Sequence, residues 1–160
     1  MHIPRVFALG VLSLAAAALP ASAGAAGWSH FTSALLHFSI DYPTGWHTVY
    51  SAGGKGELFK VTNSEVIGVT YIGSGRTQTA AHAAAGFAAH DLKHGWHLSR
   101  ITNGSGQSSY TGVDKSGLHQ TQMVLLRGGT LYGVFVLAYS KTYTTDNQFA
   151  THMAGTLAAH

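Results

Sequence analysis

The chain contains no cysteine, and charged residues make up only 9% of its 160 positions. The absence of cysteine excludes disulfide bonds, thiolate metal ligands and a cysteine nucleophile, so packing alone must stabilise the fold. The 9 basic residues are scattered, which argues against nucleic acid as a partner. The 6 acidic residues stand singly, so no carboxylate pair of the kind used in glycoside hydrolysis is indicated. With no G-x-S-x-G motif either, the sequence predicts no catalytic residues.

Long apolar runs are also missing, except at the N-terminus. Arg5 precedes an almost wholly apolar stretch, residues 6–19, and Pro20 ends it. The Ala-Ser-Ala sequence at 21–23 fits the small-x-small rule for signal-peptide cleavage. The stretch is shorter than the roughly 20 residues of a membrane-spanning helix. Residues 1–23 are therefore predicted to be a signal peptide.

The predicted cleavage fixes what remains of the chain. The mature protein is expected to start at Gly24, or at Gly27 if the cut falls after Ala26. Residues 24–160 are expected to form a single domain without a transmembrane segment. This predicts a periplasmic or secreted location.

Alternation of apolar and polar residues predicts many strands. Phe38, Ile40 and Tyr42 share one sheet face, and Pro43 ends their strand because it has no N–H to donate. The Gly128–Gly129 pair between two apolar runs predicts a two-residue hairpin turn. The strands expected are 28–32, 37–42, 46–50, 58–62, 66–72, 96–102, 107–111, 118–127 and 131–139. The last of these is almost uniformly apolar, which indicates a central strand.

A first helix is expected from about Thr79 to His94. Its apolar residues recur at helical spacing and form a narrow face that could lie close to a sheet. These residues are Ala81, Ala84, Ala85, Ala88 and Leu92. Gly95 follows directly, which is typical of a helix C-terminus.

A second helix is expected to begin near Thr145. Thr145 and Gln148 have the spacing of a capping box, and Phe149, Met153 and Leu157 recur at the spacing of a buried stripe. Many strands with one helix midway and one at the end predict an α+β fold, in which helices sandwich an antiparallel sheet.

The sequence FSIDYPTGW at 38–46 resembles the opening of the PsbP-like domain family. The resemblance continues in order through a hairpin at Phe59, the mid-chain helix, the hairpin that ends in 131–139, and the last helix with Phe149. It covers about residues 28–158 and implies the family's α/β/α fold. The motifs that carry it are structural, so it implies no catalytic residue and no particular partner.

Histidine is unusually frequent, with 11 in the chain. His90 and His94 lie four residues apart on one predicted helix face, close enough to share a metal ion. His97 or His82 could supply a third ligand, and neutral imidazoles suit Zn²⁺, Ni²⁺ or Cu²⁺. The alternative is that these are surface residues, since a histidine at a helix C-terminus interacts favourably with the helix dipole.

The same segment, His90 to His94, resembles the H-E-x-x-H pattern of zinc proteases. Asp91 stands where the pattern has glutamate, and its shorter side chain reaches a zinc-bound water less easily. Gly73-Ser74-Gly75, followed by Arg76, could hold an anion before the first helix, although a strand-to-helix turn is the simpler interpretation. Aromatic residues could line a groove between sheet and helix. They are Trp28, Trp46, Trp96, Tyr110, Tyr132, Tyr139 and Tyr143.

Taken with the resemblance, these patterns favour an exported, non-enzymatic accessory protein that binds a protein partner or a small ligand and uses no cofactor. The alternative is a histidine-based periplasmic metal-binding protein. Its ligands would be His90, His94 and His97, and its metal Zn, Cu or Ni.

Overall fold

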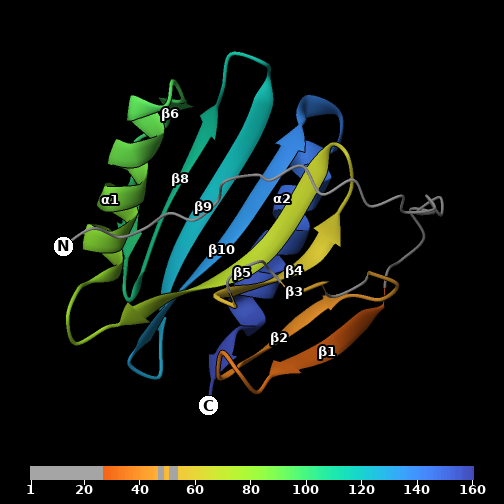
Figure 1. The fold of residues 1–160 in the computed structure, drawn as a ribbon, viewed down its shortest axis with the longest axis vertical. Helices are drawn as coiled ribbons and strands as arrows, with labels where there is room; N and C mark the ends of the chain where they lie inside the picture. The colour runs from red at the N-terminus through yellow and green to blue at the C-terminus, as the bar shows by residue number, and fades with distance from the viewer. Residues whose placement is uncertain (1–26, 47–48, 51–53) are drawn as a thin grey trace.

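A computed structural model describes residues 27–46, 49–50 and 54–160. Its strands are β1 (Trp28–Ser33), β2 (Phe38–Pro43), β3 (Val49–Tyr50), β4 (Gly56–Val61), β5 (Glu65–Ser74), β6 (His97–Leu98), β7 (Thr102–Gly104), β8 (Gln107–Val113), β9 (Leu118–Arg127), β10 (Thr130–Tyr139) and β11 (Ala158–Ala159). Its helices are α1 (Ala80–Lys93) and α2 (Ser140–Thr156). Figure 1 shows a large twisted sheet between the two helices, with the β1–β2 hairpin beside it. The predicted α+β fold with an antiparallel sheet is confirmed.

The large sheet has eight strands, in the order β3-β4-β5-β10-β9-β8-β6, with β7 paired to β8. β10 lies in the middle, as its apolar sequence predicts. β9 and β10 pair over their whole length, and the turn between them places Gly128 at φ 54° and Gly129 at φ 78°. Positive φ at both positions is what a type I′ turn requires, so the predicted hairpin is confirmed.

The small sheet has the order β1-β2-β11, which brings the two ends of the described chain together. β2 pairs with β1 from Ser33↔Phe38 to Trp28↔Pro43, and on its other edge with β11. Tyr132 of β10 ties this sheet to the large one, because its hydroxyl donates to the carbonyl of His37 at 2.9 Å. The two ends of the described chain therefore pack against the centre of the fold.

Two apolar clusters occupy the two faces of the large sheet. The one on the α2 side includes Phe38, Phe59 and Met153. The one under α1 is smaller and is built from Ala80, Ala83, Ala84, Val124 and Leu131. Because successive β9 residues point to opposite faces, Val124 faces α1 while Met123 and Leu125 belong to the α2 side.

Helix α1 has almost the predicted ends. Thr79 is its N-cap, and the Thr79 hydroxyl accepts a hydrogen bond from the His82 amide at 3.1 Å. The predicted buried face was partly wrong, since only Ala84 and Ala88 of it are buried. The other residues of that face (Ala81, Ala85 and Leu92) are exposed, and the buried ones are instead Ala80, Ala83 and Asp91. Alanines occur on every side of this helix, so their spacing does not determine which side faces the sheet.

Helix α2 begins at Ser140, five residues before the predicted start, so the proposed Thr145 capping box was wrong. β10 runs directly into the helix, and the N-cap residue Tyr139 makes no side-chain capping bond. The predicted buried stripe is right for Met153 and Leu157 and wrong for Phe149, which is only half-buried. The buried residues within the helix are Asp146, Ala150, Met153 and Ala154.

The segment predicted as one strand over 96–102 forms two short ones, β6 and β7, separated by residues 99–101. Of the predicted strand at 46–50, β3 covers Val49–Tyr50, and residues 47–48 lie outside the described part. The predicted signal peptide at 1–23 also lies outside the described residues. Within the described chain, neither helix combines the length and apolarity needed to cross a bilayer.

Candidate functional site

A groove of about 390 Å³ lies on the α2 side of the large sheet, between α2, β8, β9 and the segment 99–102. β8 contributes Ser109 and Thr111 to its floor, opposite Met123 and Thr121 of β9. These four share one face because cross-strand partners point to the same side of a sheet. Asn147, Thr151 and Gly155 of α2 form one wall. Most of the polar atoms at the surface of the groove are therefore hydroxyls and amides.

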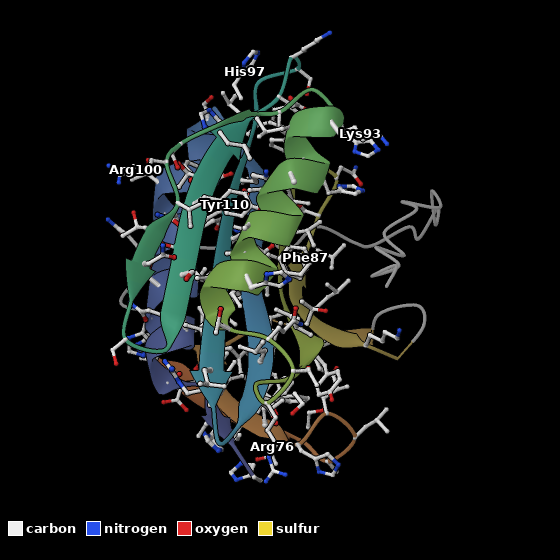
Figure 2. The ribbon with its side chains drawn as sticks, turned by 90° about the vertical axis from the view of Figure 1, so that its left-hand side faces the viewer. Arg76, Phe87, Lys93, His97, Arg100 and Tyr110 are labelled. Atoms are coloured by element: carbon white, nitrogen blue, oxygen red, sulfur yellow. The ribbon has the colours of Figure 1, made fainter. Side chains whose placement is uncertain are left out.

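Two arginines line this groove, and they are held differently. Arg127 donates to carbonyls at the end of α2, from Nε to Leu157 at 3.2 Å and from Nη2 to Ala154 at 3.4 Å. The Arg100 guanidinium is exposed and has no hydrogen bond or ion pair within the described chain. Figure 2 shows the Arg100 side chain pointing outward on the flank of the sheet opposite α1.

None of the described carboxylates lines the groove. All 6 acidic residues of the chain are bound elsewhere. The pairs are Asp41 with His30, Glu57 with Ser33, Glu65 and Asp146 with Lys60, Asp91 with Tyr110, and Asp114 with Ser116. The two guanidinium charges therefore make the groove a region of positive potential.

One polar atom at the groove is buried without a partner. Asn147 Oδ1 accepts no hydrogen bond from any described group, although Thr151 Oγ1 donates to the Asn147 backbone carbonyl at 2.7 Å. A buried acceptor without a donor costs free energy, about 1–3 kcal/mol. Rotation of the Asn147 side chain toward the groove would let a ligand hydroxyl satisfy it.

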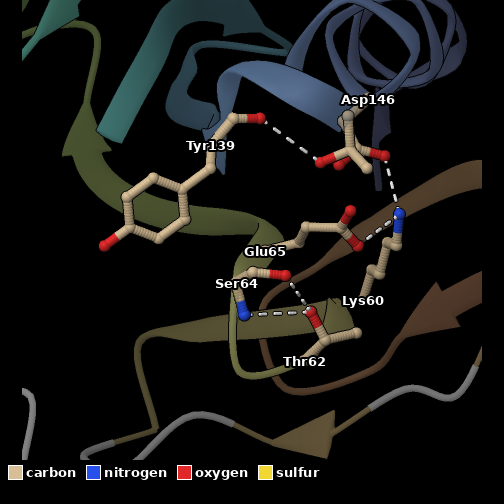
Figure 3. Close-up of polar contacts among 7 residues, drawn as sticks. Lys60, Thr62, Ser64, Glu65, Tyr139 and Asp146 are labelled. Carbon is tan, nitrogen blue, oxygen red and sulfur yellow. Dashed lines mark hydrogen bonds and ion pairs between the residues drawn. The ribbon is translucent and has the colours of Figure 1, made fainter. Parts of the chain in front are cut away.

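A buried ion cluster lies between β4, β5 and α2 (Figure 3). Lys60 Nζ is 2.7 Å from Glu65 Oε2 and 2.7 Å from Asp146 Oδ1. The Asp146 side chain is only 1% exposed, and its Oδ2 has no hydrogen-bond partner among the described groups. The cluster therefore places two carboxylates around one ammonium group.

The pKa values of this cluster follow from burial and from hydrogen bonds to Lys60. Burial raises the pKa of Asp146, and the bond from Lys60 offsets only part of this effect. Burial also acts to raise the pKa of Glu65, but hydrogen bonds from Lys60 and Thr142 bring it below its usual value. The pKa of Lys60 is raised, because its bonds to both carboxylates outweigh the effect of burial, which lowers it.

The structure brings His90 and His94 together. Their rings stack with centroids 4.1 Å apart and an interplanar angle of 21°, and His94 Nδ1 lies 2.7 Å from the His90 carbonyl oxygen. His82 and His97 are both exposed, and Figure 2 shows His97 beyond the end of α1. No three His, Cys, Asp or Glu side chains in the described part of the chain form a metal-holding group. The metal site stays a prediction, with two adjacent imidazoles as its basis.

Asp91 is buried under α1, whereas His90 and His94 are exposed, and its Oδ1 lies 3.5 Å from His90 Nδ1. Its Oδ2 accepts hydrogen bonds from Tyr110 Oη at 2.7 Å and from Gln120 Nε2 at 2.9 Å, beneath the helix. The carboxylate therefore ties α1 to β8 and β9. Its Oδ2 is engaged by these two donors, whereas the acid of the H-E-x-x-H pattern acts on a metal-bound water.

The other predicted features have structural roles. Ser74 closes a turn, since its carbonyl accepts from Thr77 Oγ1 at 2.9 Å and its hydroxyl accepts from the Arg76 amide at 3.2 Å. Trp28 stacks on His152 of α2, with ring centroids 3.6 Å apart. Of the aromatic residues proposed to line a groove, only Tyr110 lines this one.

Sequence analysis missed Arg100 and Asn147 as site residues. A signal was present, because polar residues alternate through Gln107, Ser109 and Thr111 on one face of the predicted strand. What that face meets depends on α2, whose start was wrongly predicted.

The architecture is a PsbP-like fold. The solution structure of cyanobacterial PsbP (CyanoP) from Synechocystis sp. PCC 6803 matches 89% of this chain and 98% of its own, with a TM-score of 0.58 and 17% identity. The crystal structure of LpqN, involved in cell envelope biogenesis of Mycobacterium tuberculosis, matches 85% of this chain and 86% of its own, with a TM-score of 0.42 and 13% identity. No protein-family model matches the chain, and no curated protein matches its sequence. The predicted resemblance in fold is confirmed, and at this identity it concerns the fold alone.

Proposed function

We propose that this protein is an exported, non-enzymatic accessory protein that holds a small ligand in the groove between α2 and β8. The observation that carries the proposal is the groove itself, which is 390 Å³ in volume and is lined by hydroxyls, amides and two arginines. This volume lies within the range of small-molecule sites, about 300–1,000 Å³.

The walls of the groove are fixed by bonds between α2 and β9. Tyr143 Oη donates to the Gln120 carbonyl at 3.2 Å and lies 2.6 Å from Thr121 Oγ1. Arg127 holds the other end of α2. A preformed site loses little conformational entropy on binding, which favours ligand binding.

The chemistry of the lining supports binding rather than turnover. Among the described residues that line the groove there is no histidine, aspartate, glutamate, lysine or cysteine. A hydroxyl such as that of Ser109 or Thr111 therefore has no adjacent base to activate it.

The test is an NMR titration of the ¹⁵N-labelled protein, residues 24–160, with a library of small polar metabolites. We expect the perturbed amides to cluster on β8, β9 and α2. Ser109→Trp, which fills the floor of the groove, should abolish binding, whereas Thr32→Trp on the exposed edge strand β1 should not. Turnover of a bound compound, or binding that Ser109→Trp leaves unchanged, would contradict the proposal.

Export is the other part of the proposal, and its basis is the apolar run of residues 6–19 with the Ala-Ser-Ala site at 21–23. N-terminal sequencing of the protein from the periplasm or medium should begin at Gly24 or Gly27. A cytosolic protein with an intact Met1 would exclude export.

A second candidate function is metal binding, favoured by the adjacent rings of His90 and His94. Titration calorimetry at neutral pH should detect about one equivalent of Zn²⁺ or Cu²⁺. The His90→Ala, His94→Ala double variant should lose this binding, and the control His30→Ala, at a histidine on β1, should keep it. Equal binding by the double variant would exclude a site at these residues.

A further inference from the structure

The groove concentrates positive charge that no described acidic residue neutralises. Arg100 has no partner among the described groups, and Arg127 is bound only to carbonyl oxygens, three of them. All 6 carboxylates are bound at other places. An arginine with unused N–H donors is suited to a planar or tetrahedral oxyanion, which it binds through two parallel hydrogen bonds.

The two arginines would contribute in different ways. Arg127 has already used donors of all three guanidinium nitrogens on the carbonyls of Leu126, Ala154 and Leu157, so it mainly supplies charge. Arg100 is exposed beside the groove and has its donors available. An anionic group is therefore expected at the Arg100 end of the groove.

The remainder of the lining combines hydroxyls with the apolar side chains of Met123, Leu125 and Ala154, which suits a molecule with both hydroxyls and a carbon skeleton. Ser109 and Thr111 present hydroxyls, which both donate and accept hydrogen bonds, and the Thr151 hydroxyl, which donates to the Asn147 carbonyl, can still accept one. The buried Asn147 Oδ1 lacks a donor among the described groups, and rotation of the side chain toward the groove would bring it to a ligand O–H. A fully apolar ligand would leave these groups unsatisfied, at a cost in affinity.

We infer that the ligand of this groove is a small, hydroxylated oxyanion, with its carboxylate or phosphate at Arg100 and its hydroxyls against Asn147 and the β8–β9 floor. This inference rests on the proposed function and names the chemical class of its ligand. The shared chemistry is an anionic oxygen group on a polyhydroxy body.

The experiment uses three probes that separate the two parts of this ligand. Glucuronate carries both the anion and the hydroxyls, glucose carries only the hydroxyls, and inorganic phosphate carries only the anion. Each is titrated into the protein by NMR and by calorimetry, at low and at moderate salt. Glucuronate is expected to bind most tightly and to weaken with salt, because the interaction with the guanidinium groups is screened.

Two variants test the contact with the anion and the contact with the hydroxyls separately. Arg100→Gln should lower glucuronate affinity about tenfold or more and leave glucose unaffected. Asn147→Ala should weaken glucuronate and glucose and leave phosphate unaffected. Arg76→Gln is the matched control and should change nothing, because Arg76 is also exposed but does not line the groove.

Other outcomes separate this inference from the proposed function. If glucose binds in the groove as tightly as glucuronate, and Arg100→Gln has no effect, the anion assignment is wrong but a groove-binding function stands. If phosphate alone binds as well as glucuronate, the hydroxyl part is wrong. If glucuronate fails to perturb the groove even at millimolar concentration, the inference is overturned, and the metabolite library then decides on the proposed function independently.

Discussion

Lys60 is the residue on which the buried ion cluster depends. It is bound to both Glu65 and Asp146, and the Asp146 side chain is almost fully buried. Removing one partner of a buried ion pair leaves an uncompensated charge, which costs about 3–5 kcal/mol. The bonds formed by Lys60 therefore matter more for stability than those of the exposed lysines.

Lys60→Met should accordingly lower the free energy of unfolding at neutral pH by about 3 kcal/mol, because two carboxylates then remain buried without a counter-ion. Urea denaturation monitored by circular dichroism measures this change. The control Lys55→Met removes an exposed lysine and should stay within about 0.5 kcal/mol of the wild type. Equal stability of both variants would show that the cluster does not stabilise the fold.

Removing the charge of Glu57 is expected to stabilise the fold, in contrast to removing that of Lys60, and the size of the effect depends on pH. It is buried on β4, and this burial raises its pKa although Ser33 Oγ donates to it at 3.0 Å. A carboxyl whose folded pKa exceeds its unfolded value contributes stability below the unfolded pKa, here 4.5, and this contribution is lost as the pH rises through the folded pKa.

Glu57→Gln keeps an acceptor for Ser33 and removes the charge. We expect its melting temperature to rise by a few degrees at pH 7, corresponding to about 1 kcal/mol, and to show no gain near pH 4. Thermal denaturation at the two pH values measures the difference. A variant less stable than the wild type at pH 7 would contradict this account of Glu57.

Of the two helices, α1 has the smaller apolar side chains on its buried face. Alanines form most of its buried face, and the Asp91 carboxylate supplies a polar attachment to β8 and β9. Alanine buries little surface, so this buried hydrogen-bond network is expected to carry much of the docking free energy of the helix.

Tyr110→Phe should therefore loosen α1. Loss of the Tyr110 hydroxyl removes one donor to a buried carboxylate, at a cost of about 1–3 kcal/mol. Hydrogen exchange measured by mass spectrometry should show faster exchange over residues 80–93, while Tyr139→Phe, at an exposed tyrosine, should leave it unchanged. Uniform destabilisation without a local effect on α1 would refute a specific role in helix docking.

Elements whose signals are local could be predicted from sequence. The period-two pattern around Ile40 and the positive-φ turn at Gly128–Gly129 depend on neighbouring residues only, and both were confirmed. The start of α2 was missed because it is set by where β10 ends, and no side chain caps it. The site was missed for a related reason, since Arg100 and Asn147 come together only after α2 packs on β9.

The small sheet joins the first two strands of the described chain to its last strand. β2 is paired on one edge with β1 and on the other with β11, and the Asp41 amide donates to Thr156 Oγ1 at 3.0 Å. A two-stranded hairpin alone is marginally stable in water. The β1–β2 hairpin therefore depends on the residues that follow α2.

Deleting residues 158–160 should expose this dependence. We expect faster amide exchange in β1 and β2, because β2 loses its second neighbour and the bond from the His160 amide to the His37 carbonyl. Exchange in the β9–β10 hairpin serves as the internal control and should not change. Unaltered protection of residues 38–43 would show that β11 contributes nothing to the hairpin.

The pairing of β2 with β11 also limits when the small sheet can form during synthesis. During synthesis β1 and β2 emerge before β11, so β2 cannot gain its second neighbour until residue 159 has emerged. The large sheet can assemble around the β9–β10 hairpin, whose contacts are local and fast to form. During synthesis, we expect the small sheet to be completed only after β11 has emerged.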